Sequence, residues 1–220
     1  TETRRRIRGE IADRIEHDRG GGDPDNVVIS LCEWDRTLEG QSLADILAGR
    51  NVASDFVTAA DLVMELIQRG GARAIYHAMD ERDVERIMQH PSTMIGSDGG
   101  VSVFGAGVPH PREYGTFPRV LGRYVRERGV LTLEEAVRKM SGATAQRLGL
   151  QQRGLLQEEF YADITVFDPE LVGDRATFES PHQYAVGVQY VIVNGHLVID
   201  QGEHTGARPG RVLYGPGREH

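Results

Sequence analysis

The first part of the chain shows apolar patterns that predict three helices and one strand. Isoleucines at positions 7, 11 and 15 form a single apolar stripe on a charged segment, which predicts a helix that packs through one face. Glycines and a proline at 20–24 end this helix, and residues 26–31 (NVVISL) predict a short buried strand. We expect a short helix at 42–48 and a longer one from 54 or 58 to 69, which ends at two glycines.

A strand, a helix and a second strand are predicted next. Residues 73–79 predict a strand, 80–89 a helix that stops before Pro91, and 93–97 (TMIGS) another strand. Short connections between such elements are typical of a parallel sheet. Residues 99–115 are rich in glycine and lack periodicity, and a loop of this length in a compact protein is usually functional or disordered.

The last third of the chain changes from helical to strand periodicity. Thr116 has the features of an N-cap for a helix that reaches 129, and Thr132 to Glu135 predict a capping box for a helix that reaches 148. After residue 153 the apolar period is two, which predicts strands at 163–168, 188–194 and 196–200. The Asn-Gly pair at 194–195 predicts a hairpin between the last two strands, and 206–217 form an extended tail.

Composition and charge exclude several classes of protein. With 220 residues, 39% hydrophobic and 26% charged, the chain is long enough for one large domain or one and a half. No run approaches the about 20 apolar residues that cross a bilayer, and the charged N-terminus does not resemble a signal peptide. A net charge of −8 argues against nucleic acid as a partner. The single cysteine, Cys32, cannot form an internal disulfide, so we expect a cytoplasmic protein with a packed thiol.

Asp98 is the strongest candidate for chemistry. It follows the predicted strand 93–97 and precedes two glycines, and ligands of parallel α/β folds bind at the carboxyl ends of strands. Asp98 is therefore a candidate base or metal ligand, and a turn-forming role is the alternative. His110 lies in the following loop, close enough in sequence to share a site with Asp98, with a surface position as its alternative.

The other polar candidates carry weaker signals. The eight histidines form no His-x-His or His-x-x-x-His pattern, so no zinc site is built from a local motif. Tyr76 and its neighbour His77 must point to opposite sides of their predicted strand. Arg112, Arg119 and Arg123 are able to bind a carboxylate, but the last two lie four residues apart on a predicted helix and are expected to be solvated.

Two segments carry a resemblance to a known family. Residues 95–99 (IGSDG) and 110–126 (HPREYGTFPRVLGRYVR) resemble the N-acyl-D-amino-acid deacylases (D-aminoacylases), a branch of the amidohydrolase superfamily. The run 110–126 is specific to this branch. Five further segments also fit the family: 25–29, 133–140, 153–156, 162–169 and 190–195.

The resemblance implies a fold and a set of site residues. It implies the C-terminal part of an α/β fold, a (β/α)8 barrel with strands of a small β-sandwich. Barrel units at 1–153 would include an insertion at about 18–79 that covers the active site, and 154–220 would form sandwich strands and the tail. It makes Asp98 a catalytic residue and zinc ligand at the end of the eighth strand, and makes Tyr76, Arg112 and His110 contacts of the substrate. The family's other metal ligands, including a His-x-His motif, lie in segments that this chain does not match.

The activity implied by the resemblance is deacylation of a small-molecule N-acyl-D-amino acid to a D-amino acid and a carboxylate by a zinc-dependent hydrolase. Two alternatives are an amidohydrolase activity on a cyclic amide, of dihydroorotase or hydantoinase type, and an inactive scaffold or assembly fragment. Because one carboxylate cannot hold zinc, we expect this chain alone to be inactive. Half a barrel leaves strand edges unpaired, so we expect it to need the missing N-terminal half or to self-associate.

Overall fold

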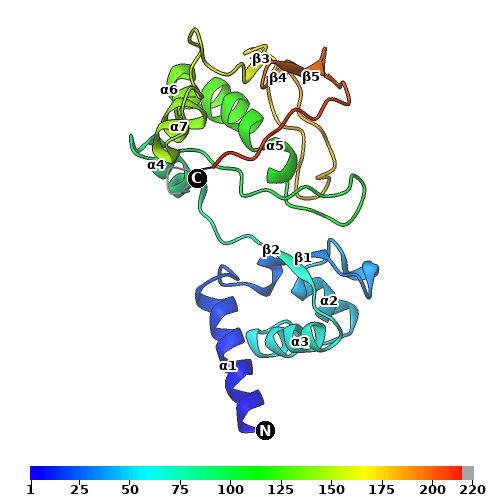
Figure 1. Cartoon of the computed structure of the whole chain (residues 1–220). Helices are drawn as coiled ribbons and strands as arrows, with labels where there is room; N and C mark the ends of the chain where they lie inside the picture. The colour runs from blue at the N-terminus through cyan, green and yellow to red at the C-terminus, as the bar shows by residue number, and fades with distance from the viewer. Residues whose placement is uncertain (215–220) are drawn as a thin grey trace. The chain divides into compact units, whose positions relative to one another are not determined.

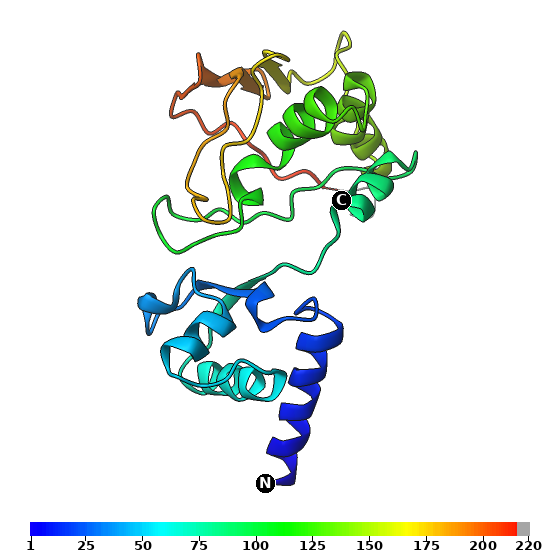
Figure 2. The same ribbon diagram turned by 180° about the vertical axis from the view of Figure 1, so that it is seen from behind.

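The computed structural model describes residues 1–214, which divide into two compact units (Figures 1 and 2). Unit 1 contains Thr1–Glu81, Gly100–Pro111 and Thr177–His182. Unit 2 contains Arg82–Gly99, Arg112–Ala176 and the chain from Gln183 onward. The predicted tail at 206–217 continues past residue 214, and its end lies outside the described residues. None of the described helices is long and apolar enough to cross a membrane.

Unit 1 contains three helices, two short 3-10 turns and two strands. In chain order these are α1 Glu2–His17, η1 Pro24–Asn26, β1 Val27–Leu31, η2 Arg36–Leu38, α2 Leu43–Gly49, α3 Phe56–Gln68 and β2 Arg73–Tyr76. The predicted helices and the first strand are therefore confirmed. Their starts are fixed by side chains, since Ser42 with Asp45 and Asp55 with Thr58 form reciprocal capping boxes.

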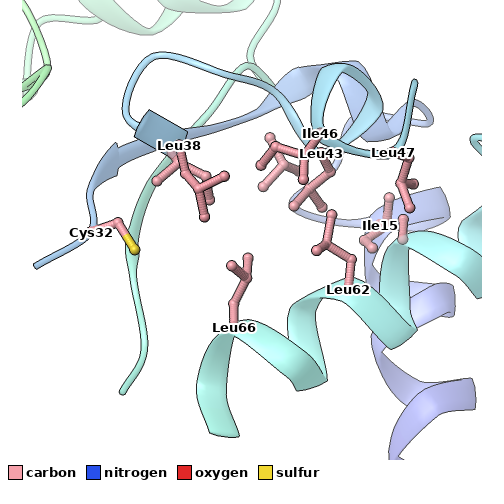
Figure 3. Packing of buried hydrophobic residues seen from close by; sticks show 11 residues of the cluster. Ile15, Cys32, Leu38, Leu43, Ile46, Leu47, Leu62 and Leu66 are labelled. Atoms are coloured by element: carbon pink, nitrogen blue, oxygen red, sulfur yellow. The ribbon is translucent and has the colours of Figure 1, made fainter. Parts of the chain in front are cut away.

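The core of unit 1 is apolar and lies where the helices meet the strand β1. Figure 3 shows Ile15 of α1, Leu43 of α2 and Leu62 of α3 among the buried side chains of one cluster. Cys32 belongs to this cluster with 1% of its surface exposed, which confirms the predicted packed thiol. Helix α1 packs against α3, so α3 is the element that the predicted apolar stripe of α1 packs on.

The prediction of a parallel sheet is wrong for the described residues. Strand β1 pairs antiparallel with β2, with Val27 opposite Tyr76, and every other strand pair in residues 1–214 is also antiparallel. Helix α4 Glu81–Gln89 forms as predicted, but 93–97 is not a strand. The Ile95 N–H donates to the Lys139 carbonyl at 3.2 Å, so this backbone is bound to a helix end instead of a neighbouring strand.

The helix predicted to have Thr116 as its N-cap begins earlier, at Arg112. Helix α5 spans Arg112–Arg119, and the Thr116 hydroxyl donates to the Arg112 carbonyl at 2.9 Å instead of capping the helix. Pro118 then lies inside the helix and has no N–H to donate. The following turns, Val120–Glu127, form the π-helix η3.

The helix predicted at 132–148 is divided in two. Helix α6 spans Leu133–Met140 and α7 spans Gly142–Leu148, and Ser141 between them has non-helical dihedral angles. Thr132 caps α6 by accepting from the Glu135 N–H at 3.2 Å. The side chain of Glu135 contacts Arg138 and Lys139, so only the Thr132 half of the predicted capping box is formed.

A four-stranded antiparallel sheet completes unit 2. Its strands, in their order across the sheet, are β3 Ile164–Phe167, β4 Val188–Val193, β5 His196–Asp200 and β6 Glu203–His204. Asn194 and Gly195 have φ angles of +48° and +79°, which confirms the predicted tight hairpin. A second apolar cluster includes Val120, Tyr124 and Ala136, and Phe167 and Val188 of the sheet pack against it.

Candidate functional site

Asp98 lies in unit 2 with its carboxylate open to solvent. Its side chain is 90% exposed, and one carboxylate oxygen lies 3.0 Å from an Nη atom of Arg112. Its φ of +46° is in the left-handed region, which aspartate enters more readily than most residues. Aspartates adopt this conformation in turns and at active sites alike, and the exposed carboxylate leaves Asp98 accessible to a ligand.

Gly99 and helix α5 fix the position of Asp98. A Cβ atom on Gly99 would lie 3.0 Å from the Arg112 carbonyl oxygen and 3.1 Å from the Glu113 Cα, so only glycine fits here without a shift. The Gly99 N–H also donates to the Ser97 hydroxyl at 3.3 Å. This close packing brings Asp98 beside Arg112, the first residue of α5, and so brings two of the predicted site residues together.

The other two predicted site residues, Tyr76 and His110, belong to unit 1. Tyr76 ends β2 with about half of its surface exposed, and the Arg19 guanidinium lies 5.9 Å from its ring centre. The His110 ring lies edge-on to Phe178, with 5.0 Å between ring centres. His77 approaches the same Phe178 ring at 4.4 Å. Sequence reasoning missed Phe178, because it stands alone in a stretch without periodicity.

Arg119 forms an ion pair and is only partly solvated, with 39% of its side chain exposed, whereas its helical spacing predicted a solvated side chain. Its guanidinium donates to Asp174 at 2.9 Å, and the Asp174 side chain is 13% exposed. Burial opposes the charge of Arg119, but hydrogen bonding and charge pairing with Asp174, with a smaller effect of Tyr124, raise its pKa. Helical spacing identifies a face of α5 and does not reveal what packs on it.

A complete metal site is not present among residues 1–214. No group of three or more histidine, cysteine, aspartate or glutamate side chains in this range is close enough to hold a metal ion. A catalytic zinc ion takes about three protein ligands and keeps one position open for water. The exposed Asp98 carboxylate is chemically suited to supply one oxygen ligand.

Comparison with known proteins assigns the chain to a family. Residues 10–199 match the family model described as the amidohydrolase family. The chain belongs to the amidohydrolase family. Among its relatives, a D-aminoacylase from Alcaligenes xylosoxydans xylosoxydans is 46% identical over 186 residues, which are 84% of this chain and 36% of the relative. An N-acyl-D-aspartate deacylase from the same organism is 51% identical over 143 residues, 64% of this chain and 28% of the relative.

Solved structures give the same assignment. An N-acyl-D-glutamate deacylase from Bordetella bronchiseptica, complexed with zinc and a phosphonate inhibitor, matches with a TM-score of 0.76 and 42% identity over 92% of this chain and 39% of that one. A D-aminoacylase with a binuclear metal centre matches with a TM-score of 0.73 and 39% identity over 91% of this chain and 44% of that one. The chain thus spans about a third of the length of the curated relatives that it matches.

These similarities decide some of the sequence predictions. The resemblance to the D-aminoacylases is confirmed, and so is the fold class, a mixed α/β part of an amidohydrolase barrel with additional strands. The predicted boundary between 1–153 and 154–220 and the insertion at about 18–79 stay predictions. The roles of Asp98, Arg112, Tyr76 and His110 also stay predictions.

Proposed function

We propose that this amidohydrolase chain is the C-terminal portion of a zinc-dependent hydrolase that cleaves N-acyl-D-amino acids into a D-amino acid and a carboxylate. The similarity to relatives named D-aminoacylase, N-acyl-D-glutamate deacylase and N-acyl-D-aspartate deacylase supports this substrate class. The observation that carries the proposal is the exposed Asp98 carboxylate, held beside Arg112 by the packing of Gly99 on α5.

Asp98 is suited to move the proton that amide hydrolysis requires. An amide nitrogen is a poor leaving group unless it is protonated, so a nearby group must take a proton from the attacking water and deliver it to that nitrogen. Zinc, when bound, would supply a Lewis acid that lowers the pKa of water to about 7. The Asp98 carboxylate then needs only to accept the proton on one oxygen and pass it on to the departing amine.

Arg112 is suited to bind the α-carboxylate of the substrate. Its planar guanidinium offers two parallel donors to a carboxylate, a geometry that lysine lacks. In the structure one Nη atom already contacts the carboxylate of Asp98, so the same group has the right donors for a carboxylate. Tyr76 and His110 are proposed as further substrate contacts.

The test replaces Asp98 with asparagine in the complete, zinc-loaded enzyme. Asp98→Asn keeps the size and removes the proton acceptor, so kcat for an N-acetyl-D-amino acid should fall at least about 100-fold. Asp200→Asn, at an exposed position of β5, is the matched control and should leave kcat unchanged. Near-normal turnover by Asp98→Asn would make Asp98 a turn residue and contradict the proposal.

The substrate class is tested with the same enzyme preparation. Arg112→Ala should mainly raise KM. An unchanged KM would show that another cationic residue binds the substrate carboxylate. Turnover of hydantoin or dihydroorotate without turnover of N-acetyl-D-amino acids would favour the cyclic-amide activity. The 220-residue chain alone should bind less than one equivalent of zinc and show no turnover. One bound equivalent of zinc together with turnover would instead show that this chain is an active enzyme by itself.

A further inference from the structure

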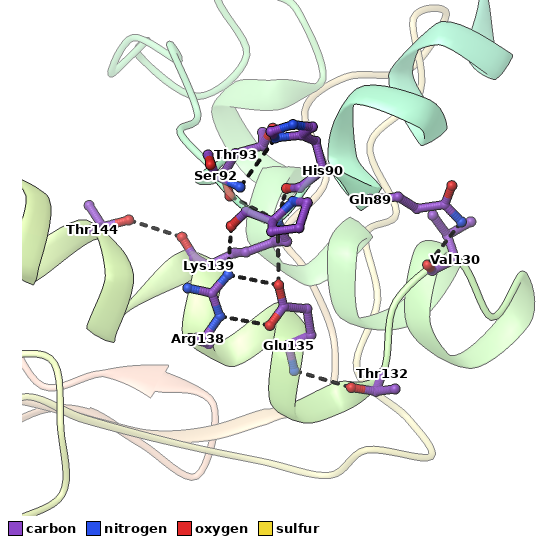
Figure 4. Close-up of polar contacts among 11 residues, drawn as sticks. Gln89, His90, Ser92, Thr93, Val130, Thr132, Glu135, Arg138, Lys139 and Thr144 are labelled. Atoms are coloured by element: carbon purple, nitrogen blue, oxygen red, sulfur yellow. Dashed lines mark hydrogen bonds and ion pairs between the residues drawn. The ribbon is translucent and has the colours of Figure 1, made fainter.

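Lys139 is a fully buried lysine near the end of α6. Its surface is 0% exposed, and Ser42 is the only other buried polar or charged residue among residues 1–214. Its ammonium group donates to the His90 carbonyl at 2.5 Å and to the Thr93 carbonyl at 3.0 Å, and it lies 3.5 Å from a Glu135 oxygen (Figure 4). Three acceptors thus surround a group that has three donors.

The backbone of Lys139 contacts the same segment as its side chain. The Lys139 carbonyl accepts from the Ile95 N–H at 3.2 Å, and the Thr144 hydroxyl donates to that carbonyl at 2.9 Å. One residue of α6 therefore binds His90, Thr93 and Ile95. Residues 93–97 have no strand partner, so these contacts supply the backbone hydrogen bonds that a neighbouring strand would supply in a sheet.

The buried position makes these contacts strong. An ammonium group out of water is tolerated only when charge and hydrogen bonds compensate its lost hydration. If Lys139 were replaced by an apolar residue, the partly buried carbonyls of His90 and Thr93 would lose this donor, and the His90 carbonyl would keep only the Thr93 N–H at 3.0 Å. The segment 90–95 would then lose the side-chain contacts that tie it to α6.

Asp98 follows this segment directly. Asp98 lies three positions after Ile95, a chain length of at most about 11 Å. On the other side, Gly99 packs against the first turn of α5. Asp98 thus lies between two held positions: Ile95, whose N–H is bound to the end of α6, and Gly99, which packs against the start of α5.

We propose that Lys139 is a positioning residue for Asp98: its three contacts with His90, Thr93 and Ile95 hold the segment that carries the carboxylate. The proposal rests on the proposed role of Asp98 in hydrolysis. Lys139 touches neither the substrate nor the reacting atoms, and it acts only through the backbone that leads to Asp98.

The first measurement uses the 220-residue chain. Lys139→Met keeps an unbranched side chain that reaches the position of Cε and removes the ammonium donors, and Arg138→Met is the matched control. Arg138 is the preceding residue of α6, is 46% exposed and donates to the Pro91 carbonyl without contacting Thr93 or Ile95. Amide hydrogen exchange at 95–98 should accelerate at least about tenfold in Lys139→Met and less than about twofold in Arg138→Met. Equal exchange in both variants would overturn the proposal.

The second measurement uses the complete, zinc-loaded enzyme. Lys139→Met should lower kcat about 10-fold to 100-fold, the effect of a misplaced catalytic group, with KM nearly unchanged. Adding Lys139→Met to Asp98→Asn should cause no further loss, because a residue that acts through Asp98 has nothing left to position. Normal turnover by Asp98→Asn would disprove the proposed function. A large loss in Asp98→Asn together with normal kcat in Lys139→Met, or with additive losses, would disprove only the role of Lys139.

A rescue experiment covers the case in which Lys139→Met does not fold. Lys139→Ala leaves a cavity that propylammonium, a primary alkylammonium ion, is able to enter. Propylammonium should restore slow exchange at Ile95 and raise kcat, whereas propanol, which carries no charge, should do neither. Absence of rescue by propylammonium would overturn the proposal.

Discussion

Units 1 and 2 hold their backbones in different ways. In unit 1, regular helices with capped ends meet in an apolar cluster, and side chains such as Leu43 and Leu62 contribute to stability through burial. In unit 2, long segments without regular structure lie against helices whose cationic side chains bind their carbonyl groups. Lys139 binds two carbonyls of the segment 90–93, and Arg126 of η3 binds those of Pro169 and Val172.

The difference shows what an irregular backbone requires. Helices and sheets satisfy their own carbonyls, so an apolar face is enough to anchor them. A segment without a ladder needs donors from elsewhere, and lysine and arginine offer several donors at the end of a long side chain. Unit 2 is therefore expected to be more sensitive to the loss of a cation, and unit 1 to the loss of apolar volume.

The largest expected effect on stability is the loss of volume in unit 1. Leu62→Ala removes a buried side chain of α3 and should lower the free energy of unfolding by about 2–5 kcal/mol. Val57→Ala, at an exposed position of the same helix, should change it by less than about 0.5 kcal/mol. Fluorescence of Trp34, the single tryptophan, which packs against the same cluster, reports urea unfolding of unit 1. Equal effects of the two substitutions would show that the apolar cluster does not hold this unit.

A pair of glycine substitutions sharpens the comparison. A Cβ on Gly122 of η3 would lie 2.7 Å from the Val172 carbonyl oxygen, so Gly122→Ala should destabilise unit 2 by about 1–3 kcal/mol. Gly9 of α1 has nothing within 4 Å of such an atom, and Gly9→Ala should stabilise its helix by about 0.5–1 kcal/mol. Amide exchange in η3 and in α1 measures the two effects. Effects of the same sign would contradict the close packing of η3 on residues 172–173.

The smallest expected effect is a dependence of stability on pH. The hydrogen bond from Arg138 lowers the pKa of Glu135 from 4.5 to about 2 against the opposing effect of burial, and the charges of Arg138 and Lys139 add to the lowering. A lowered carboxyl pKa stabilises the fold above about pH 4.5, and this stabilisation is lost as the pH falls toward 2. Glu135→Gln should therefore be less stable than the natural chain at neutral pH, by a margin that shrinks between pH 4.5 and 2.

Urea midpoints measured at a series of pH values test this expectation. Glu134→Gln, at an exposed position of the same helical turn, is the control for removing one negative charge. If the stability difference between Glu135→Gln and the natural chain stays constant down to pH 2, the charge of Glu135 does not contribute to stability.

The same contrast explains which elements the sequence predicts. The helices of unit 1 follow from apolar stripes and caps, and the hairpin at 194–195 follows from Asn-Gly, because these signals act within a few residues. The residues 93–97 look like a buried strand by composition, but the partner of Ile95 is Lys139, 44 positions later (139 − 95 = 44). The start of α5 and the division at Ser141 depend on distant packing in the same way.

The sequence suggests residues for the candidate site but not how they are arranged. A carboxylate next to paired glycines draws attention to Asp98, and the resemblance of 110–126 draws attention to Arg112. Their contact at 3.0 Å requires the backbone of Gly99 to pass beside α5. No local sequence pattern predicts this packing. The environment of His110 depends on Phe178, which lies 68 positions later (178 − 110 = 68).

The burial of Cys32 has a practical consequence for labelling. Thiol reagents attack the accessible thiolate, and a cysteine with 1% of its surface exposed reacts only when the structure around it opens. A cysteine introduced on the surface of either unit is thus available for selective attachment of a fluorophore or spin label, without first removing the natural thiol. The rate at which Cys32 itself is modified then reports how often unit 1 opens around it.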